Sequence, residues 1–300
     1  MLKVSVITDG VSQDFRRAVE FARRFQLEGL ELRSVWDSPV ERLTLAQIQE
    51  IRKCLAGTEL VISAVISPFL KCPIDDREAV EQHLRWLGRS IEIAEHLGCD
   101  LVCTATFFRN GALEAEFDRV TEAYERALLI AARVGVRLAV ENEHTTMVRT
   151  GEELGRFLTR LGSPLARACW DPQEHYLCVE GQDEPHRGYE AVRGLVAHVH
   201  LKDVRFLPGR KAVEFVPLGE GEVGVAEQLR ALLADGYRGF VSLDPRWRPH
   251  VLIPGAEELD PDFPIRTVAE YAAWVSMRRL KEMLAELLAL DLGSPSSRKD

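Results

Sequence analysis

The sequence predicts an α/β fold that consists of a single (β/α)8 TIM barrel. Eight short apolar segments alternate with segments of helical periodicity along 300 residues. No change in composition divides the chain, and about 250 residues is a typical length for such a barrel. The first apolar segment is not followed by the G-x-G-x-x-G motif that a dinucleotide-binding domain needs. We therefore expect one barrel domain over residues 1–292 with an extended C-terminal helix, followed by a disordered polar tail over 293–300.

The predicted strands and helices follow one another in strict alternation. Strands are expected at 2–8, 29–35, 59–67, 100–107, 136–143, 166–171, 195–203 and 240–246. Helices are expected at 13–27, 44–56, 75–97, 113–134, 150–161, 183–193, 224–235 and 264–292. Thr44 with Gln47, and Thr150 with Glu153, have the spacing of a capping box at a helix start. Helix ends are marked by residues that tolerate a left-handed C-cap, namely Gly57, Gly98, Gly135 and Gly162.

Composition excludes several classes of protein. The chain has 38 basic and 47 acidic residues, a net charge of −9 and no basic patch, which argues against a nucleic-acid partner. The first ten residues become polar too early for a signal peptide, and no apolar run reaches about 18 residues. We therefore expect a cytoplasmic protein with no membrane partner. Its six cysteines lack C-x-x-C spacing and are expected to be reduced, and a homo-oligomer is compatible with the sequence.

The predicted strand 195–203 has one apolar face and one chemically active face. Alternation along a strand places His198, His200 and Lys202 on the same side. Two imidazoles and an ammonium group suit the floor of a pocket, and neutral imidazole is the commonest metal ligand in proteins. We expect His198, the deeper of the two, to be a hydrogen-bonded interior residue. An ordinary amphipathic strand with incidental histidines is the alternative.

Carboxylates at the ends of three other predicted strands also face the barrel axis. Because inward residues near the C-terminal strand ends surround the active site of such a barrel, Glu141, Asp171 and Asp244 are expected to meet His200. Carboxylates this close repel one another unless a cation lies between them. Three oxygen donors and one imidazole favour a single divalent ion, Mn²⁺, Mg²⁺ or Co²⁺, over Zn²⁺.

Further polar residues are candidates for contact with a substrate. Glu31, Arg33 and Arg246 are predicted to face the inside of the barrel, and Glu174 and His175 follow the sixth predicted strand. For Glu31 and Arg33 the alternative is a structural ion pair, and for Glu174 and His175 it is a plain surface position. An ion-pair network at the rim that joins Arg33, Arg246 and Lys202 to the carboxylates is the alternative to a metal site.

Five short motifs in order carry a resemblance to a known family. They are VEN at 140–142, WDP at 170–172, HVHLKD at 198–203, LGEG at 218–221 and GYRGFVSLD at 236–244. With this order and spacing, residues 1 to about 275 resemble the xylose isomerase-like sugar isomerase and epimerase superfamily. The resemblance implies one divalent metal ion held by Glu141, Asp171, His200 and residue 244. The chain departs from the family at Asp244, where glutamate is usual, and at Glu174, where histidine or asparagine is common.

The resemblance implies a metal-dependent isomerase or epimerase that acts on a ketose or related sugar through a metal-stabilised enediolate. In this role Glu141 is expected to act as general base or acid, Asp244 to oppose it across the substrate, and Lys202 to steady developing negative charge. The family also contains inosose dehydratases, so a keto-polyol dehydratase is an alternative. A barrel that has lost catalysis and only binds a sugar is another, which the shorter Asp244 keeps open. The related endonuclease branch needs extra histidines after the third and fourth strands, where this chain has none.

Overall fold

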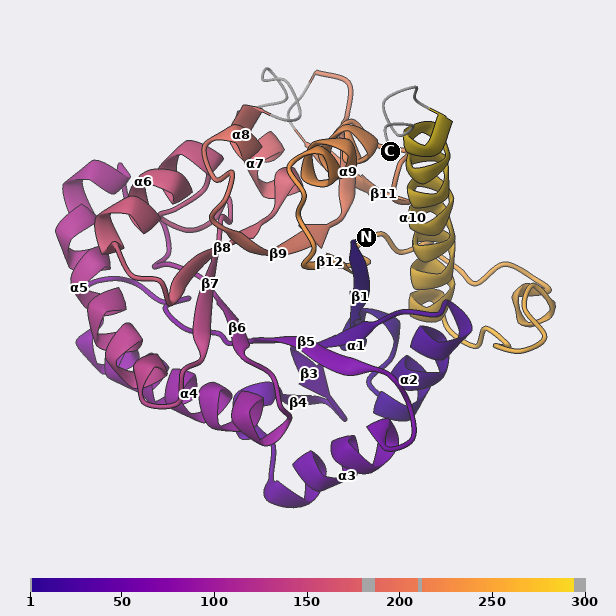
Figure 1. Ribbon diagram of the computed structural model, residues 1–300, viewed down its shortest axis with the longest axis horizontal. Helices are drawn as coiled ribbons and strands as arrows, with labels where there is room; N and C mark the ends of the chain where they lie inside the picture. Colours follow the sequence, from indigo (N-terminus) through magenta and orange to yellow (C-terminus); the bar gives the residue numbers. More distant parts are fainter. Residues whose placement is uncertain (1, 180–186, 210–211, 294–300) are drawn as a thin grey trace, which may run out of the picture.

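The computed structural model describes residues 2–179, 187–209 and 212–293. Eight parallel strands close into a barrel in the order β1-β12-β9-β8-β7-β6-β5-β2, with helices around them (Figure 1). The barrel strands are β1 (Lys3–Ile7), β2 (Gly29–Leu32), β5 (Val61–Ile66), β6 (Leu101–Thr104), β7 (Arg137–Glu141), β8 (Ala166–Trp170), β9 (Val196–Leu201) and β12 (Phe240–Leu243). Each lies within a segment predicted as a strand. The predicted (β/α)8 barrel is therefore confirmed.

Seven of the predicted helices lie where the sequence places them. They are α2 (Phe15–Arg24), α3 (Leu45–Leu55), α4 (Arg77–His96), α5 (Leu113–Ala132), α6 (Gly151–Leu161), α9 (Val225–Ala234) and the extended α10 (Val268–Gly293). Both predicted capping boxes form, at Thr44 and Thr150. The four predicted stop glycines all have positive φ, between 56° and 77°. The single domain over 1–292 stays a prediction, and the tail predicted from 293 lies outside the described residues beyond Gly293.

The segment after β8 differs from the prediction. The helix expected at 183–193 lies partly outside the described residues, which omit 180–186, and within them α8 (Arg187–Glu190) ends before residue 191. An unpredicted helix, α7 (Pro172–Cys178), starts directly at the strand end instead. Asp171 accepts a hydrogen bond from the backbone N of Glu174 at 3.1 Å, and proline at the first helical position has a suitable φ. The Asp-Pro pair at 171–172 was therefore a start signal that periodicity alone overlooks.

Three further short elements extend the loops at the C-terminal ends of the strands. A helical turn, α1 (Thr8–Val11), follows β1, and a two-stranded sheet pairs β3 (Ser34–Val35) with β4 (Ser38–Pro39). A hairpin of β10 (Asp203–Phe206) and β11 (Val213–Val216) follows β9. The predicted strand 195–203 is thus divided, and Lys202 lies between its two parts.

The predicted alternation of inward and outward residues is visible on β8. The indole Nε1 of Trp170 donates to Gln228 Oε1 of the surrounding helix α9 at 3.1 Å, so this side chain points outward. Its neighbour Cys169 is buried on the opposite, interior face of the strand. The residue after Trp170, Asp171, therefore turns inward at the end of the strand.

Close backbone packing at the start of α6 leads to a first prediction. A Cβ atom on Gly151 would lie 1.8 Å from the carbonyl oxygen of Gly188, which is backbone and cannot move aside cheaply. We expect Gly151→Ala to lower the free energy of unfolding by about 1–3 kcal/mol, the usual cost of overpacking. The matched control is Gly88→Ala in α4, where a Cβ meets nothing within 4 Å, and which should stabilise by about 0.5–1 kcal/mol. Urea unfolding curves measure both, and equal effects of the two substitutions would contradict the packing argument.

Candidate metal centre

Three of the four predicted metal ligands meet at the C-terminal ends of β7, β8 and β9. Glu141, Asp171 and His200 each offer a donor atom, and these three atoms lie within 4.8 Å of one another. His200 Nδ1 is 2.8 Å from Glu141 Oε1. Asp171 is fully buried, His200 is 2% exposed and Glu141 is 9% exposed. Two carboxylates and an imidazole that converge in a buried position are a donor set suited to a divalent cation.

Asp244, the fourth predicted ligand, contacts cationic side chains. It lies just beyond β12 and is buried, and its Oδ2 accepts from Arg246 Nε at 2.7 Å. Its Oδ1 is 3.4 Å from Arg33 Nη1, and Lys202 Nζ lies 3.7 Å from Oδ2. Within the described parts of the chain, the donor atoms grouped within 4.8 Å do not include Asp244. The predicted rim network of Arg33, Arg246 and Lys202 is thus present around Asp244. The role of Asp244 as a metal ligand or proton carrier stays a prediction.

Lys202 links the metal cluster to Glu174. Its buried Nζ lies 2.9 Å from Asp171 Oδ2 and 2.7 Å from Glu174 Oε1. Glu174 reaches this position because α7 begins directly after β8. The backbone N of His144 donates to Glu174 Oε2 at 3.0 Å, and the imidazole Nδ1 of His144 contacts the same oxygen. His144 was not anticipated, although it lies only three residues after Glu141 in the loop beyond β7.

The buried carboxylates of the cluster have pKa values that are shifted in opposite directions. The pKa of Asp171 is raised to about 7, mainly by burial and also by the carboxylates of Glu174 and Glu141, against the opposing effect of Lys202. Burial also acts to raise the pKa of Glu174, but Lys202 and His144 hold it well below its usual range. The ammonium group of Lys202 lies within 3.7 Å of three buried carboxylates, those of Asp171, Glu174 and Asp244. A divalent cation beside Asp171 would favour its ionised form.

Glu31 lies inside the barrel, in contact with both histidines of β9. Its Oε2 accepts from His198 Nε2 at 3.0 Å, and its Oε1 accepts from His200 Nε2 at 3.1 Å. His198 is thus the hydrogen-bonded interior residue that the sequence predicts. Arg33 donates from Nε to Asp9 Oδ2 at 3.0 Å, an ion pair that was not predicted. Substrate contact by Glu31 and Arg33 stays a prediction.

The two remaining candidates for substrate contact lie in different surroundings. His175 is buried against the start of α6, where its Nδ1 accepts from the backbone N of Gly151 at 3.3 Å, and its ring lies 5.5 Å from that of Trp170. This environment favours a structural role for His175. The side chain of Arg246 is 47% exposed while it pairs with Asp244, so its guanidinium group is accessible from solvent.

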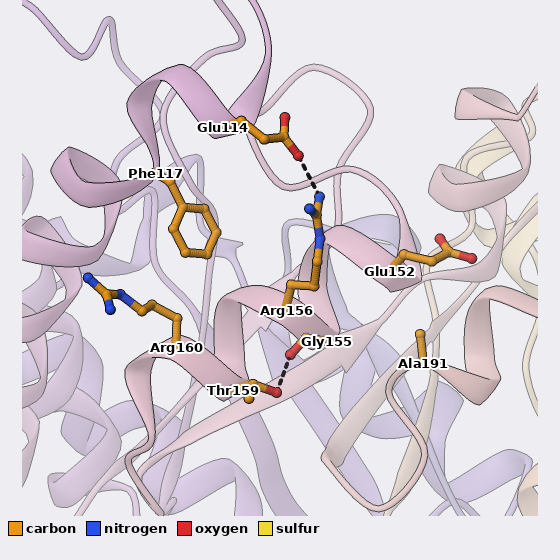
Figure 2. Close-up of a pocket in the computed structure, with 8 residues that line it drawn as sticks. All are labelled: Glu114, Phe117, Glu152, Gly155, Arg156, Thr159, Arg160 and Ala191. Atoms are coloured by element: carbon orange, nitrogen blue, oxygen red, sulfur yellow. Dashed lines mark hydrogen bonds and ion pairs between the residues drawn. The ribbon is translucent and has the colours of Figure 1, made fainter.

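A pocket of about 780 Å³ on the outer wall of the barrel is separate from this cluster. Figure 2 shows it between α5 and α6, where Arg156 pairs with Glu114 at 2.7 Å beside the ring of Phe117. Its lining side chains come from the helical layer and none belongs to the predicted site. The chemistry of the strand ends therefore does not extend to it.

Comparison with known proteins identifies the family. The family model described as xylose isomerase-like TIM barrel matches residues 19–271 of the chain. The chain belongs to the xylose isomerase-like TIM barrel family. Its buried cluster of glutamate, aspartate and histidine is accordingly a candidate divalent-metal site. Across the described residues, no helix of this xylose isomerase-like barrel combines the length and apolar character needed to cross a bilayer.

Individual relatives of this xylose isomerase-like barrel are distant. An inosose dehydratase of Yersinia enterocolitica is 25% identical over 154 residues, which are 47% of this chain and 51% of the dehydratase. The match therefore spans about half the length of this curated relative. Among solved structures, the D-allulose 3-epimerase from Methylomonas sp. in complex with D-allulose has a TM-score of 0.71 at 16% identity, covering 95% of this chain and 96% of the epimerase. A xylose isomerase-like TIM barrel protein from Mycobacterium smegmatis in complex with magnesium has a TM-score of 0.63 at 18% identity, covering 91% and 89% of the two chains.

Proposed function

We propose that this chain is a divalent-cation-dependent enzyme that removes a proton from the carbon next to the carbonyl of a ketose or keto-polyol. The observation that carries the proposal is the convergence of Glu141, Asp171 and His200 within 4.8 Å, in a chain of the xylose isomerase-like family. Mn²⁺, Mg²⁺ or Co²⁺ suits these ligands. When bound, the cation would supply Lewis-acid stabilisation of negative charge on the substrate oxygens.

Glu141 is the member of the cluster best placed to carry a proton. Its side chain is 12% exposed, whereas those of Asp171 and His200 are 0% and 2% exposed, so its carboxylate lies nearest to an entering substrate. His200 Nδ1 lies 2.8 Å from Oε1 of Glu141, so Oε1 is the oxygen on the side of the proposed cation. Oε2 is then the oxygen that would accept the proton from carbon.

Lys202 supplies the positive charge on the protein side of the reaction. Its ammonium group is held by Asp171 and Glu174, and the pKa of this buried lysine is raised well above its usual value because burial is outweighed by these carboxylates. It therefore stays charged and can donate hydrogen bonds to a substrate oxygen on which negative charge develops. An isomerase or epimerase would then return the proton to a neighbouring carbon or to the opposite face.

A dehydratase is the second candidate, because Asp244 already forms ion pairs with two arginines. Its contacts with Arg246 at 2.7 Å and Arg33 at 3.4 Å disfavour it as the second proton carrier that an epimerase needs. In a dehydration, Glu141 would take the α-proton and return it to the β-hydroxyl, which would leave as water while Lys202 keeps its charge. The products would be an unsaturated ketone and one water molecule. The partial similarity to inosose dehydratases supports this route.

The test separates these outcomes in one set of assays. The purified protein is stripped with a chelator, reloaded with Mn²⁺, Mg²⁺ or Co²⁺, and incubated in D₂O with a panel of ketoses and keto-inositols. We expect α-deuterium incorporation that needs the reloaded cation, followed over time by NMR. Deuterium exchange without water loss indicates an isomerase or epimerase, whereas an unsaturated product indicates a dehydratase. A metal-loaded protein that binds a sugar but catalyses neither process would overturn the proposed enzymatic function and indicate a sugar-binding barrel.

A further inference from the structure

We propose that Glu31 and His198 are positioning residues, which hold the imidazole of His200 in the orientation and tautomer that bind the cation. This inference rests on the cation site of the proposed function and assigns Glu31 a role beneath that site. Neither residue would need to touch cation or substrate. Their contribution would pass entirely through His200.

The first step of the argument is that the two nitrogens of His200 face different carboxylates. Nδ1 lies 2.8 Å from Glu141 Oε1, on the side of the metal cluster, and Nε2 lies 3.1 Å from Glu31 Oε1. A cation beside Glu141 and Asp171 would take the lone pair of Nδ1. The neutral imidazole then carries its proton on Nε2, and this N–H donates to Glu31. A carboxylate that accepts from the remaining N–H of a metal-bound histidine fixes the tautomer of that histidine and strengthens the histidine as a ligand.

The second step is that Glu31 is itself held in place. Its other oxygen, Oε2, accepts from His198 Nε2 at 3.0 Å, so each oxygen of the carboxylate has an imidazole donor. The two imidazole rings are perpendicular, with their centroids 5.4 Å apart. Glu31 and His198 are fully buried, and His200 is 2% exposed. Because all three side chains are enclosed, rotation of any one of them breaks a hydrogen bond that water cannot replace.

The third step is that the barrel interior leaves room for this contact. Glu31 comes from β2, and the strands β1 and β12 separate it from β9 in the barrel order. On those two strands the residues in register with His200 are small, since Ser242 pairs with His200 and Ser5 pairs with Ser242. Bulky branched residues commonly fill this layer of a TIM barrel. Serine at both positions lets the side chain of Glu31 reach the histidines.

A second cation is the competing explanation for the same cluster. Glu31, Cys103, His198 and His200 offer donor atoms within 4.8 Å of one another, and thiolate, imidazole and carboxylate are all ligands of Zn²⁺. Two hydrogen bonds of ordinary length already account for how Glu31 lies against the histidines. They do so without requiring Cys103 to lose its proton in a fully buried position. We therefore favour positioning, and a second cation becomes an outcome of the test.

The experiment measures cation affinity and stoichiometry by competition with a chromophoric chelator, using Mn²⁺ and Zn²⁺. It compares the full-length chain with Glu31→Gln, His198→Phe and the double variant, each verified as folded by circular dichroism. We expect one equivalent of cation and a loss of affinity of about 10–100-fold for Glu31→Gln, as for other groups behind a metal ligand. His198→Phe should have a smaller effect. The double variant should be no weaker than Glu31→Gln alone, because His198 acts through Glu31.

Two additional measurements make the interpretation specific. In the zinc-loaded protein with ¹⁵N-labelled histidine, NMR should show the His200 proton on Nε2, with a signal that shifts in Glu31→Gln. Cys103→Ser is the matched buried control next to His200, and it should change neither affinity nor stoichiometry.

The possible failures can be told apart. Wild-type protein that binds no cation overturns the proposed function together with this inference. Wild-type binding that Glu31→Gln leaves unchanged overturns the positioning role alone, as does a double variant whose loss equals the product of the single losses. Two equivalents of cation, one of them lost in Cys103→Ser, would replace positioning by a second metal site.

Discussion

Replacement of Glu141 by glutamine is expected to lower the rate of α-hydrogen exchange by about 10²–10⁴-fold, the usual contribution of a positioned general base. Glutamine preserves the shape of the side chain and an oxygen that can face the cation, but its amide cannot accept a proton from carbon. The assay is deuterium incorporation in D₂O at saturating sugar. Because Glu141 is also a predicted ligand, the cation must be titrated to saturation for each variant, so that weaker binding is not mistaken for slower chemistry.

The matched control for this prediction is Glu143→Gln. Glu143 lies two residues further along the chain, and it pairs with Lys71 Nζ at 2.6 Å and accepts from Thr145 Oγ1 at 3.0 Å. We expect the rate of exchange in this variant to match that of the wild type. If Glu141→Gln exchanges deuterium as fast as the wild type at saturating cation, then Glu141 is not the base.

The second large effect concerns Lys202. We expect Lys202→Met to lower the free energy of unfolding by about 3–5 kcal/mol, because it removes one partner of a buried ionic network. The ammonium group lies within 3.7 Å of Asp171, Glu174 and Asp244, all of them buried. Without it, these carboxylates lose their shared cation. Mn²⁺ should restore part of the lost stability, since a ligand that binds only the folded state stabilises it by mass action.

Chemical denaturation with and without Mn²⁺ measures this effect. The control is Lys53→Met, since Lys53 is 75% exposed and lies 3.8 Å from Glu50 in a surface pair. Its change in stability should stay within about 0.5 kcal/mol. A Lys202→Met variant as stable as the wild type would show that the carboxylates do not depend on this lysine. If Mn²⁺ stabilises Lys202→Met no more than it stabilises Lys53→Met, then the bound cation does not replace the charge of Lys202.

Much of the fold could be predicted from local signals. Capping boxes at Thr44 and Thr150 and stop glycines such as Gly162 act over a few residues, and each of them forms as expected. The error after β8 has the same local origin. Helix α7 is only seven residues long, too short to show helical periodicity, and the informative signal was instead the cap and proline at 171–172.

The candidate site was predictable to the extent that it depends on side-chain direction. The alternation of side-chain direction along the strands places Glu141, Asp171 and His200 on the inner face, and the donor atoms of these three do converge. This alternation could not show that Asp244 pairs with arginines, because Arg33 comes from a strand at the other end of the chain. The contact of His144 with Glu174 likewise depends on how two loops approach each other.

The amino-acid sequence by itself determined the alternation of strands and helices and which residues line the inside of the barrel, because both follow from backbone geometry over two to four residues. Only the tertiary structure decided the partner of each charged group. Lys202 joins α7 to β9, and Glu31 crosses the interior from β2 to the histidines of β9. Such pairings depend on distances of a few ångströms between strands that are far apart in the chain, and closure of the barrel sets those distances.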